Sequence, residues 1–142
     1  MRRAGRLAFT VVALVGNASL VQAQKPPNPV GTWKGQALAV GTGANPYRVQ
    51  ESNGPNFSKD MLEFTFNVTE QHDGRFAGSI QAGKGTEALI GALRPPYYTE
   101  GVIVDDDGRY AFKLRDAGTI DLCYDHIYPK SKVVACYSLT KQ

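Results

Sequence analysis

The sequence predicts an all-β protein, built as an antiparallel up-and-down barrel of eight strands. Short runs of aromatic and β-branched residues alternate with segments rich in glycine and proline. No window of about 12 residues keeps the apolar spacing of an amphipathic helix. Residues 62–69, LEFTFNVT, alternate apolar and polar side chains, as a strand with one buried face does. Together these observations indicate short strands joined by turns.

The same alternation places the individual strands. Sequence-adjacent hairpins of eight strands close into a barrel, which leaves no sheet edge exposed. A β-sandwich of the same strands is the alternative. The expected strands span residues 30–40, 61–70, 75–83, 87–94, 99–104, 109–115, 119–128 and 132–140.

Two turns repeat one pattern, Asp-Gly before an arginine and an aromatic residue, at 72–77 (HDGRFA) and 106–111 (DDGRYA). Both are expected to be hairpin tips, with Gly74 and Gly108 at positive φ. At the first tip a three-residue loop over 72–74 pairs Phe66 with Ile80 and Val68 with Gly78. Such a loop keeps the apolar faces together. The acidic second tip, DDDG at 105–108, is interpreted as a solvated turn rather than a calcium loop.

The first residues have the pattern of a secretory signal peptide. Arg2, Arg3 and Arg6 precede an apolar run at 7–15, and small residues at 21–23 offer a cleavage site. We therefore expect a leader over 1–23, a single barrel domain over 24–142, and a secreted or periplasmic protein. The apolar run is shorter than the roughly 20 residues of a membrane-spanning helix, and no later run approaches that length.

Charge argues against nucleic-acid binding. The chain has 16 basic and 13 acidic residues, and the expected leader carries three of the arginines and no acid. The remaining 13 basic residues only balance the 13 acidic ones and form no basic stripe, whereas nucleic-acid binding relies on clustered Lys and Arg.

The segment 123–136, CYDHIYPKSKVVAC, contains both cysteines of the chain beside an aspartate and a histidine. A zinc site would want four ligands at closer spacing, and a cysteine nucleophile would want a free thiolate. With a turn at Pro129-Lys130, Cys123 lies opposite Cys136 in a non-hydrogen-bonded pair, near enough for a disulfide. We therefore predict a stapled hairpin and no metal site. The same register turns His126 inward, either as a hydrogen-bonded residue at the rim of the core or as a ligand contact.

The residues GTWKG at 31–35 resemble the Gly-x-Trp start of the lipocalin and avidin (calycin) superfamily of small ligand-binding barrels. Trp33 is the only tryptophan. The resemblance implies that Trp33 has a structural role, closing one end of the barrel and packing against a basic residue of the last strand, here Lys141. Biotin-binding avidins continue with Asn and Ser and supply further tryptophans, which this chain lacks, so biotin is not the expected ligand.

One connection, residues 41–60, is far longer than a usual hairpin loop and is expected to be a flap over the open end of the barrel. Long loops on a rigid scaffold usually carry recognition, so ligand entry is expected there. His126, Tyr124 and Tyr47 are expected beneath the flap.

The expected function is to bind a small apolar or aromatic ligand in the barrel mouth. The alternative is a periplasmic protein-binding module, such as a hydrolase inhibitor. An enzyme is not expected, because no Ser-His-Asp spacing, catalytic carboxylate pair or cofactor fingerprint is assigned; no cofactor is expected either. The aromatic side chains expected to line the ligand site are Phe64, Phe66, Tyr110, Phe112, Tyr124 and Tyr137. Alternatively, these side chains simply fill a narrow barrel.

Overall fold

The computed structural model describes residues 24–45, 48–83 and 85–142. Side chains are described for all of these residues except those within 44–53. The expected signal peptide and Tyr47 lie outside this part. The described residues form ten strands, which are β1 Gly31–Ala37, β2 Val40–Asn45, β3 Arg48–Phe57, β4 Leu62–His72, β5 Arg75–Ala82, β6 Gly85–Leu93, β7 Glu100–Val104, β8 Arg109–Leu114, β9 Thr119–Tyr128 and β10 Ser131–Lys141.

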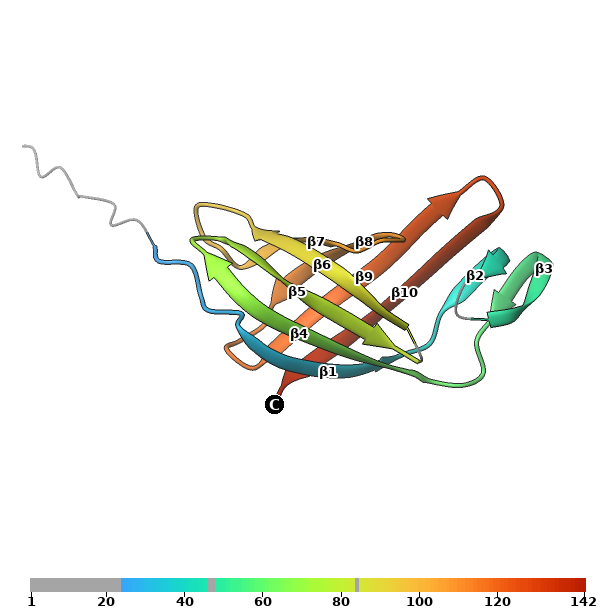
Figure 1. Cartoon of the computed structure of the whole chain (residues 1–142), viewed down its shortest axis with the longest axis horizontal. Helices are drawn as coiled ribbons and strands as arrows, with labels where there is room; N and C mark the ends of the chain where they lie inside the picture. The colour runs from blue at the N-terminus through green and yellow to red at the C-terminus, as the bar shows by residue number, and fades with distance from the viewer. Residues whose placement is uncertain (1–23, 46–47, 84) are drawn as a thin grey trace, which may run out of the picture.

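Eight of these strands form a closed antiparallel barrel, and β2 and β3 are added to it (Figure 1). Sequence-adjacent neighbours pair from β4 to β10, β1 pairs with β4, and β1 meets β10 through Trp33 with Lys141 and Lys34 with Thr140. The predicted up-and-down barrel is confirmed, and the sandwich alternative is wrong. The described residues contain no helix, and hence none that could cross a membrane.

The segment expected to be a flap is a β-hairpin instead. Strand β2 continues β1 in the same register along β10, because ten positions separate Trp33 from Gly43 on one side and Lys141 from Ser131 on the other. Strand β3 then folds back along β2 with two register shifts. The length of the segment predicts a loop, but pairing with β10 and within the hairpin makes it strand. Gly43, however, is needed within the strand: its φ is 78°, and an added Cβ would collide with the carbonyl oxygen of Lys130.

The β4–β5 hairpin confirms the predicted pairing and corrects the predicted tip. Phe66 pairs with Ile80 and Val68 with Gly78, as expected. The register then shifts between Val68 and Glu70, so the tip is a two-residue turn with His72 opposite Arg75. A β-bulge absorbs the extra residue, which lets a tight turn coexist with matched apolar faces.

The two Asp-Gly tips use glycine for close approach rather than for positive φ. Neither Gly74 nor Gly108 has positive φ; Asp73 does, at 56°. A Cβ at Gly74 would meet the ring of Tyr98 at 3.0 Å, and one at Gly108 would meet the ring of Tyr124 at 2.6 Å. The second glycine therefore lets the β7–β8 turn lie directly against the side chain of Tyr124.

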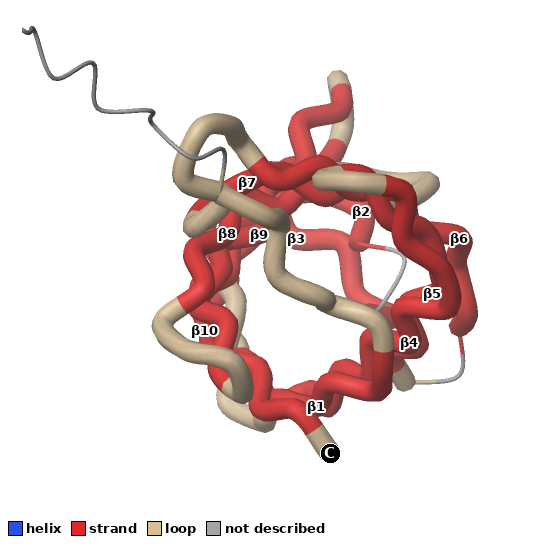
Figure 2. Tube along the Cα trace, turned by 90° about the vertical axis from the view of Figure 1, so that its left-hand side faces the viewer, coloured by secondary structure: helices blue, strands red, loops and turns tan. Residues whose placement is uncertain are grey.

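One end of the barrel is covered by residues 24–30, which run across it in Figure 2. The indole Nε1 of Trp33 donates to the Pro29 carbonyl (2.8 Å), and Gln71 Nε2 donates to the Pro27 carbonyl (2.9 Å). Lys141 Nζ lies 5.1 Å from the centroid of the Trp33 ring and donates to the Asn28 carbonyl (3.3 Å). This is the closed end. Trp33, only 2% exposed, belongs to its core.

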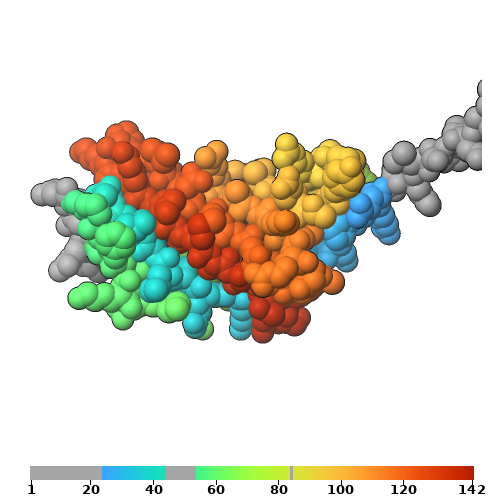
Figure 3. Space-filling model, turned by 180° about the vertical axis from the view of Figure 1, so that it is seen from behind, coloured from blue at the N-terminus to red at the C-terminus, as the bar shows by residue number. Residues whose placement is uncertain are grey.

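The opposite end carries the β2–β3 hairpin and the β5–β6, β7–β8 and β9–β10 turns, and we call it the hairpin end (Figure 1). In Figure 3 the green and cyan hairpin and the orange and red β9–β10 tip lie together at one end, and the blue residues 24–30 lie at the other. The inward side chains form a single apolar core, which includes residues near both ends of the barrel.

Candidate ligand site

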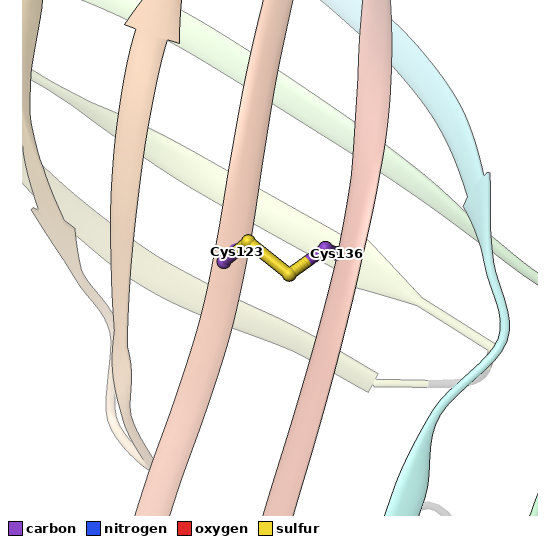
Figure 4. The surroundings of a disulfide bond; sticks show 2 residues. All are labelled: Cys123 and Cys136. Atoms are coloured by element: carbon purple, nitrogen blue, oxygen red, sulfur yellow. A yellow bond between two sulfur atoms is a disulfide. The ribbon is translucent and has the colours of Figure 1, made fainter.

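The stapled hairpin is confirmed. Tyr128 pairs with Ser131 across the turn, and Cys123 lies opposite Cys136 with their Cα atoms 4.0 Å apart and their sulfurs bonded (Figure 4). Both cysteines are on the outer face of the barrel, and neither is free. Within residues 24–45, 48–83 and 85–142 no group of three or more His, Cys, Asp or Glu is arranged to hold a metal ion.

The inner face of the same hairpin buries His126, which is 3% exposed. Its Nδ1 lies 3.0 Å from the Tyr124 hydroxyl and its Nε2 lies 2.8 Å from the Ser131 hydroxyl. Burial lowers the pKa of His126, and the nearby carboxylates of Asp107, Asp105 and Asp125 offset only part of this effect. The imidazole is therefore neutral at neutral pH, and each ring nitrogen has a hydroxyl partner.

The acidic turn after β7 is not entirely solvated, which corrects the expectation. Asp105 Oδ1 accepts from the backbone N–H groups of Asp107 (3.1 Å) and Gly108 (2.6 Å), and its Oδ2 accepts from the Tyr110 hydroxyl (2.9 Å). Only Asp106 is exposed. The carboxylate of Asp105 therefore shapes the turn and also reaches the barrel interior.

Three tyrosines, Tyr110, Tyr124 and Tyr137, meet in the interior; we call them the tyrosine cluster. The ring centroids of Tyr110 and Tyr124 are 4.7 Å apart, Phe66 packs edge-on against Tyr110 at 5.3 Å, and Phe64 stacks on Tyr137 at 4.9 Å. Burial raises the pKa of all three phenols, and the negative charge of Asp105 adds to the effect at each. The phenols therefore stay protonated throughout the physiological range.

The hydroxyl of Tyr137 has no hydrogen-bond partner among the described residues, although the side chain is only 9% exposed. The neighbouring Tyr110 hydroxyl offsets part of the rise in the Tyr137 pKa, as a nearby donor does, but the two hydroxyls do not meet the distance and angle of a hydrogen bond. Buried polar groups are nearly always paired in proteins, because an unmade hydrogen bond costs about 1–3 kcal/mol. This hydroxyl is therefore the strongest single sign of a ligand contact in the interior.

The structure brings together most of the residues predicted for the site. Phe66, Tyr110, Tyr124 and His126 form one chain of ring contacts, and Phe64 stacks on Tyr137 as a separate pair. Phe112, which was expected beside them, packs instead against Phe76, with the ring centroids 6.0 Å apart.

Three polar residues at this site were not predicted: Asp105, Ser131 and Glu87. The signal was present in the strand alternation. Asp105 continues the inward series of Gly101 and Ile103, and Glu87 lies opposite inward-facing Ile80. Turn composition places Asp105 and Ser131 between the expected strands, whereas Glu87 begins the expected strand 87–94 and its side chain was given no role.

Two concave surfaces accompany the interior. At the hairpin end, a depression of about 350 Å³ lies between the β7–β8 turn and the end of β9, and His126 is part of its lining. On the outer face of β4 to β7, a groove of about 510 Å³ is lined mainly by apolar side chains, among them the exposed Ile90, Val102 and Val104. The first surface reaches the candidate site, and the second lies outside the barrel.

Fold and site together define a closed antiparallel β-barrel with its polar interior groups gathered near one end. Compared with protein-family models, with curated proteins and with solved structures, the chain matched none.

Proposed function

We propose that this protein is an exported binding protein that holds a small ligand inside the hairpin end of its barrel. The observation that carries the proposal is the buried Tyr137 hydroxyl without a partner, which lies in an aromatic interior. Ligand sites are typically apolar and aromatic with a few polar groups that fix orientation, and the tyrosine cluster, His126 and Asp105 have this composition. The barrel and the Gly31-Thr32-Trp33 start resemble those of lipocalin- and avidin-like carriers, which supports a carrier role.

Entry at the hairpin end is part of the proposal. Residues 24–30 lie over the opposite end and are held there by Trp33, Gln71 and Lys141. The depression lined by His126 lies at the hairpin end. A ligand that enters beside the β7–β8 turn would meet His126 first and the tyrosine cluster beyond it.

Two neighbouring valines on β10 offer a matched test. Val133 is 7% exposed and lies opposite His126, whereas Val134 is 46% exposed and faces outward. We expect the neutral apolar dye Nile red to bind the unmodified protein with a rise in fluorescence. Val133→Phe should reduce this binding by filling the site, and Val134→Phe should not. Equal binding by both variants, with circular dichroism confirming that both are folded, would place the dye outside the barrel.

The exterior groove favours a second candidate function, binding of another exported protein. Exposed Ile90 and Val102 form an apolar surface of the kind that protein partners cover. Native mass spectrometry of the protein purified from its own host separates the candidates. A small molecule that co-purifies supports the carrier. A tight protein complex that is lost in an Ile90→Lys, Val102→Lys variant supports the second candidate.

A further inference from the structure

Charged side chains at the hairpin end are sorted by sign between the inside and the outside of the barrel. Asp105 points inward from the end of β7, and Glu87 shares the inward face of β6. Every lysine and arginine whose side chain is described is exposed, except Lys141 at the closed end. The described interior at the hairpin end therefore contains carboxylates and no basic side chain.

His126 does not change this balance at neutral pH. Burial lowers its pKa, and both ring nitrogens are held by neutral hydroxyl groups, those of Tyr124 and Ser131. The negative charges of Asp105, Asp107 and Glu87 act on Tyr124, where they add to the larger effect of burial in raising the phenol pKa. The site is thus electrostatically negative, although the surface around it carries both signs of charge.

The aromatic rings also contribute negative electrostatic potential to the site. The faces of aromatic rings carry negative potential, which attracts a cation within about 6 Å of the centroid, and more strongly where water is excluded. The tyrosine cluster and Phe64 place their rings close together, with centroids 4.7 Å apart for Tyr110 and Tyr124 and 4.9 Å apart for Phe64 and Tyr137. The unpartnered Tyr137 hydroxyl adds an oxygen that can accept a hydrogen bond.

We propose that the tyrosine cluster and Asp105 bind a small organic cation, either an amine or a quaternary ammonium group. The inference rests on the proposed function, because it names the ligand class of the same site. The cationic group lies against the tyrosine rings within reach of the Asp105 carboxylate. An apolar remainder packs on Phe64 and Phe66. Where the ligand is an amine, one of its N–H groups donates to the Tyr137 hydroxyl.

The opposite ligand class fits poorly. A carboxylate or phosphate placed here would lose its hydration and lie beside Asp105 with no lysine or arginine to pair with among the described interior residues. Burying an ion without a counter-charge is strongly unfavourable. A neutral apolar ligand meets no repulsion here, but it would leave the Asp105 carboxylate without a charged partner. The charge of the ligand therefore distinguishes this inference from the proposed binding of small ligands in general.

The test compares choline with its uncharged analogue, in which a tert-butyl group replaces the trimethylammonium group. The two probes match in size and shape and differ in charge. We expect choline to bind the unmodified protein at least about tenfold more tightly, measured by calorimetry and by displacement of Nile red. Equal affinities of the two probes, or displacement of Nile red by the analogue alone, would overturn the cation inference and leave the proposed function standing.

Two acids of one turn provide the matched variants. Asp105→Asn removes the inward charge and keeps an oxygen that can accept from the turn N–H groups, whereas Asp106→Asn removes an exposed charge. Choline affinity should fall about tenfold in Asp105→Asn and less than about twofold in Asp106→Asn, because exposed charges contribute little. Equal losses of choline affinity in the two variants would indicate that the acidic turn attracts the cation only at long range. That result would overturn the binding site at Asp105. If Asp105→Asn does not fold, the comparison of the two probes still decides. Failure of Nile red to respond to Val133→Phe would reject the proposed function itself.

Discussion

At the scale of single residues, His126 and Trp33 illustrate two ways in which a side chain with a polar group is accommodated in this core. Trp33 directs its one N–H to a backbone carbonyl at the closed end. His126 has a hydroxyl at each nitrogen and remains uncharged. In both cases the hydrogen bonds are satisfied within the barrel, which is what burial of a polar group requires.

The buried histidine predicts a pH dependence of stability. The pKa of His126 in the folded protein lies below the value of about 6.5 in the unfolded chain. Between these two values the unfolded chain binds a proton that the folded chain does not. The free energy of unfolding should therefore fall as the pH drops from about 6.5 through the folded pKa. Urea unfolding of His126→Gln should show less of this loss than the unmodified protein, whereas His72→Gln, which removes the exposed histidine, should retain it.

Trp33 predicts a large loss of stability on truncation. Trp33→Ala leaves a cavity at the closed end and removes the ring beneath Lys141, so the free energy of unfolding should fall by about 3–5 kcal/mol. Trp33→Phe retains most of the volume and should cost less. Chemical denaturation followed by circular dichroism measures both. A loss below about 1 kcal/mol for Trp33→Ala would mean that neighbouring side chains move in and fill the cavity left by the indole ring.

At the scale of the elements, the alternation of apolar and polar residues predicts the strands. Segment length and turn composition give wrong predictions at two places, residues 41–60 and the turn at 105–108. The faces of β4, β9 and β10 follow from a period of two, and the disulfide followed from the turn at Pro129-Lys130. The length of residues 41–60 predicts a flap, although β2 only extends β1 along β10. The acidic composition of 105–108 predicts a solvated turn, although the Asp105 carboxylate accepts from the Tyr110 hydroxyl. Pairing with β10, far along the chain, makes residues 40–43 a strand, and local composition does not encode that pairing. Asp105 faces inward because it continues the alternation of β7.

The disulfide predicts a stability effect without a binding effect. It closes a loop between residues 13 apart on the outer face, so replacing both Cys123 and Cys136 by serine should lower the free energy of unfolding by roughly 3 kcal/mol. Nile red binding should be unchanged, because the interior faces of β9 and β10 are not altered. Thiol titration of the unfolded, unreduced protein should find no free thiol. Two reactive thiols would contradict the staple.

The β2–β3 hairpin predicts a separable recognition element. Replacing residues 44–53 by a short turn containing glycine retains the pairing of β2 with β10 and of Val40 with Phe57. The barrel should stay folded, with a melting temperature within a few degrees of the unmodified protein, while Nile red or choline binding should weaken. Full affinity in the shortened protein would mean that the ligand enters elsewhere on the barrel.

At the scale of the whole molecule, the two ends of the barrel differ in construction. The closed end combines residues 24–30, Trp33 and Lys141, whereas the hairpin end combines an acidic turn, a histidine and the tyrosine cluster. One end is held by packing and by hydrogen bonds to backbone carbonyls, and the other contains the buried histidine, the tyrosine cluster and Asp105. Variants at the closed end should therefore lower stability with little effect on the proposed ligand binding.

That separation predicts the effect of removing residues 24–30. The truncated chain loses the carbonyl partners of Trp33, Gln71 and Lys141. We expect a lower free energy of unfolding and a red shift of the tryptophan emission as water reaches the indole. Nile red affinity at the hairpin end should be retained in the folded fraction. Loss of dye binding without loss of stability would mean that the ligand enters through the end that these residues cover.

The meeting of first and last strands has a practical consequence. Residues 24–30 and Gln142 lie at the same end of the barrel, where the Gln142 N–H donates to the Thr32 carbonyl (2.9 Å). A tag, a lipid or a fused protein attached after Gln142 would therefore project from the end opposite the hairpin end. The barrel could be immobilised on a sensor surface through Gln142 with the hairpin end facing the solution, an orientation suited to measuring the proposed ligand binding.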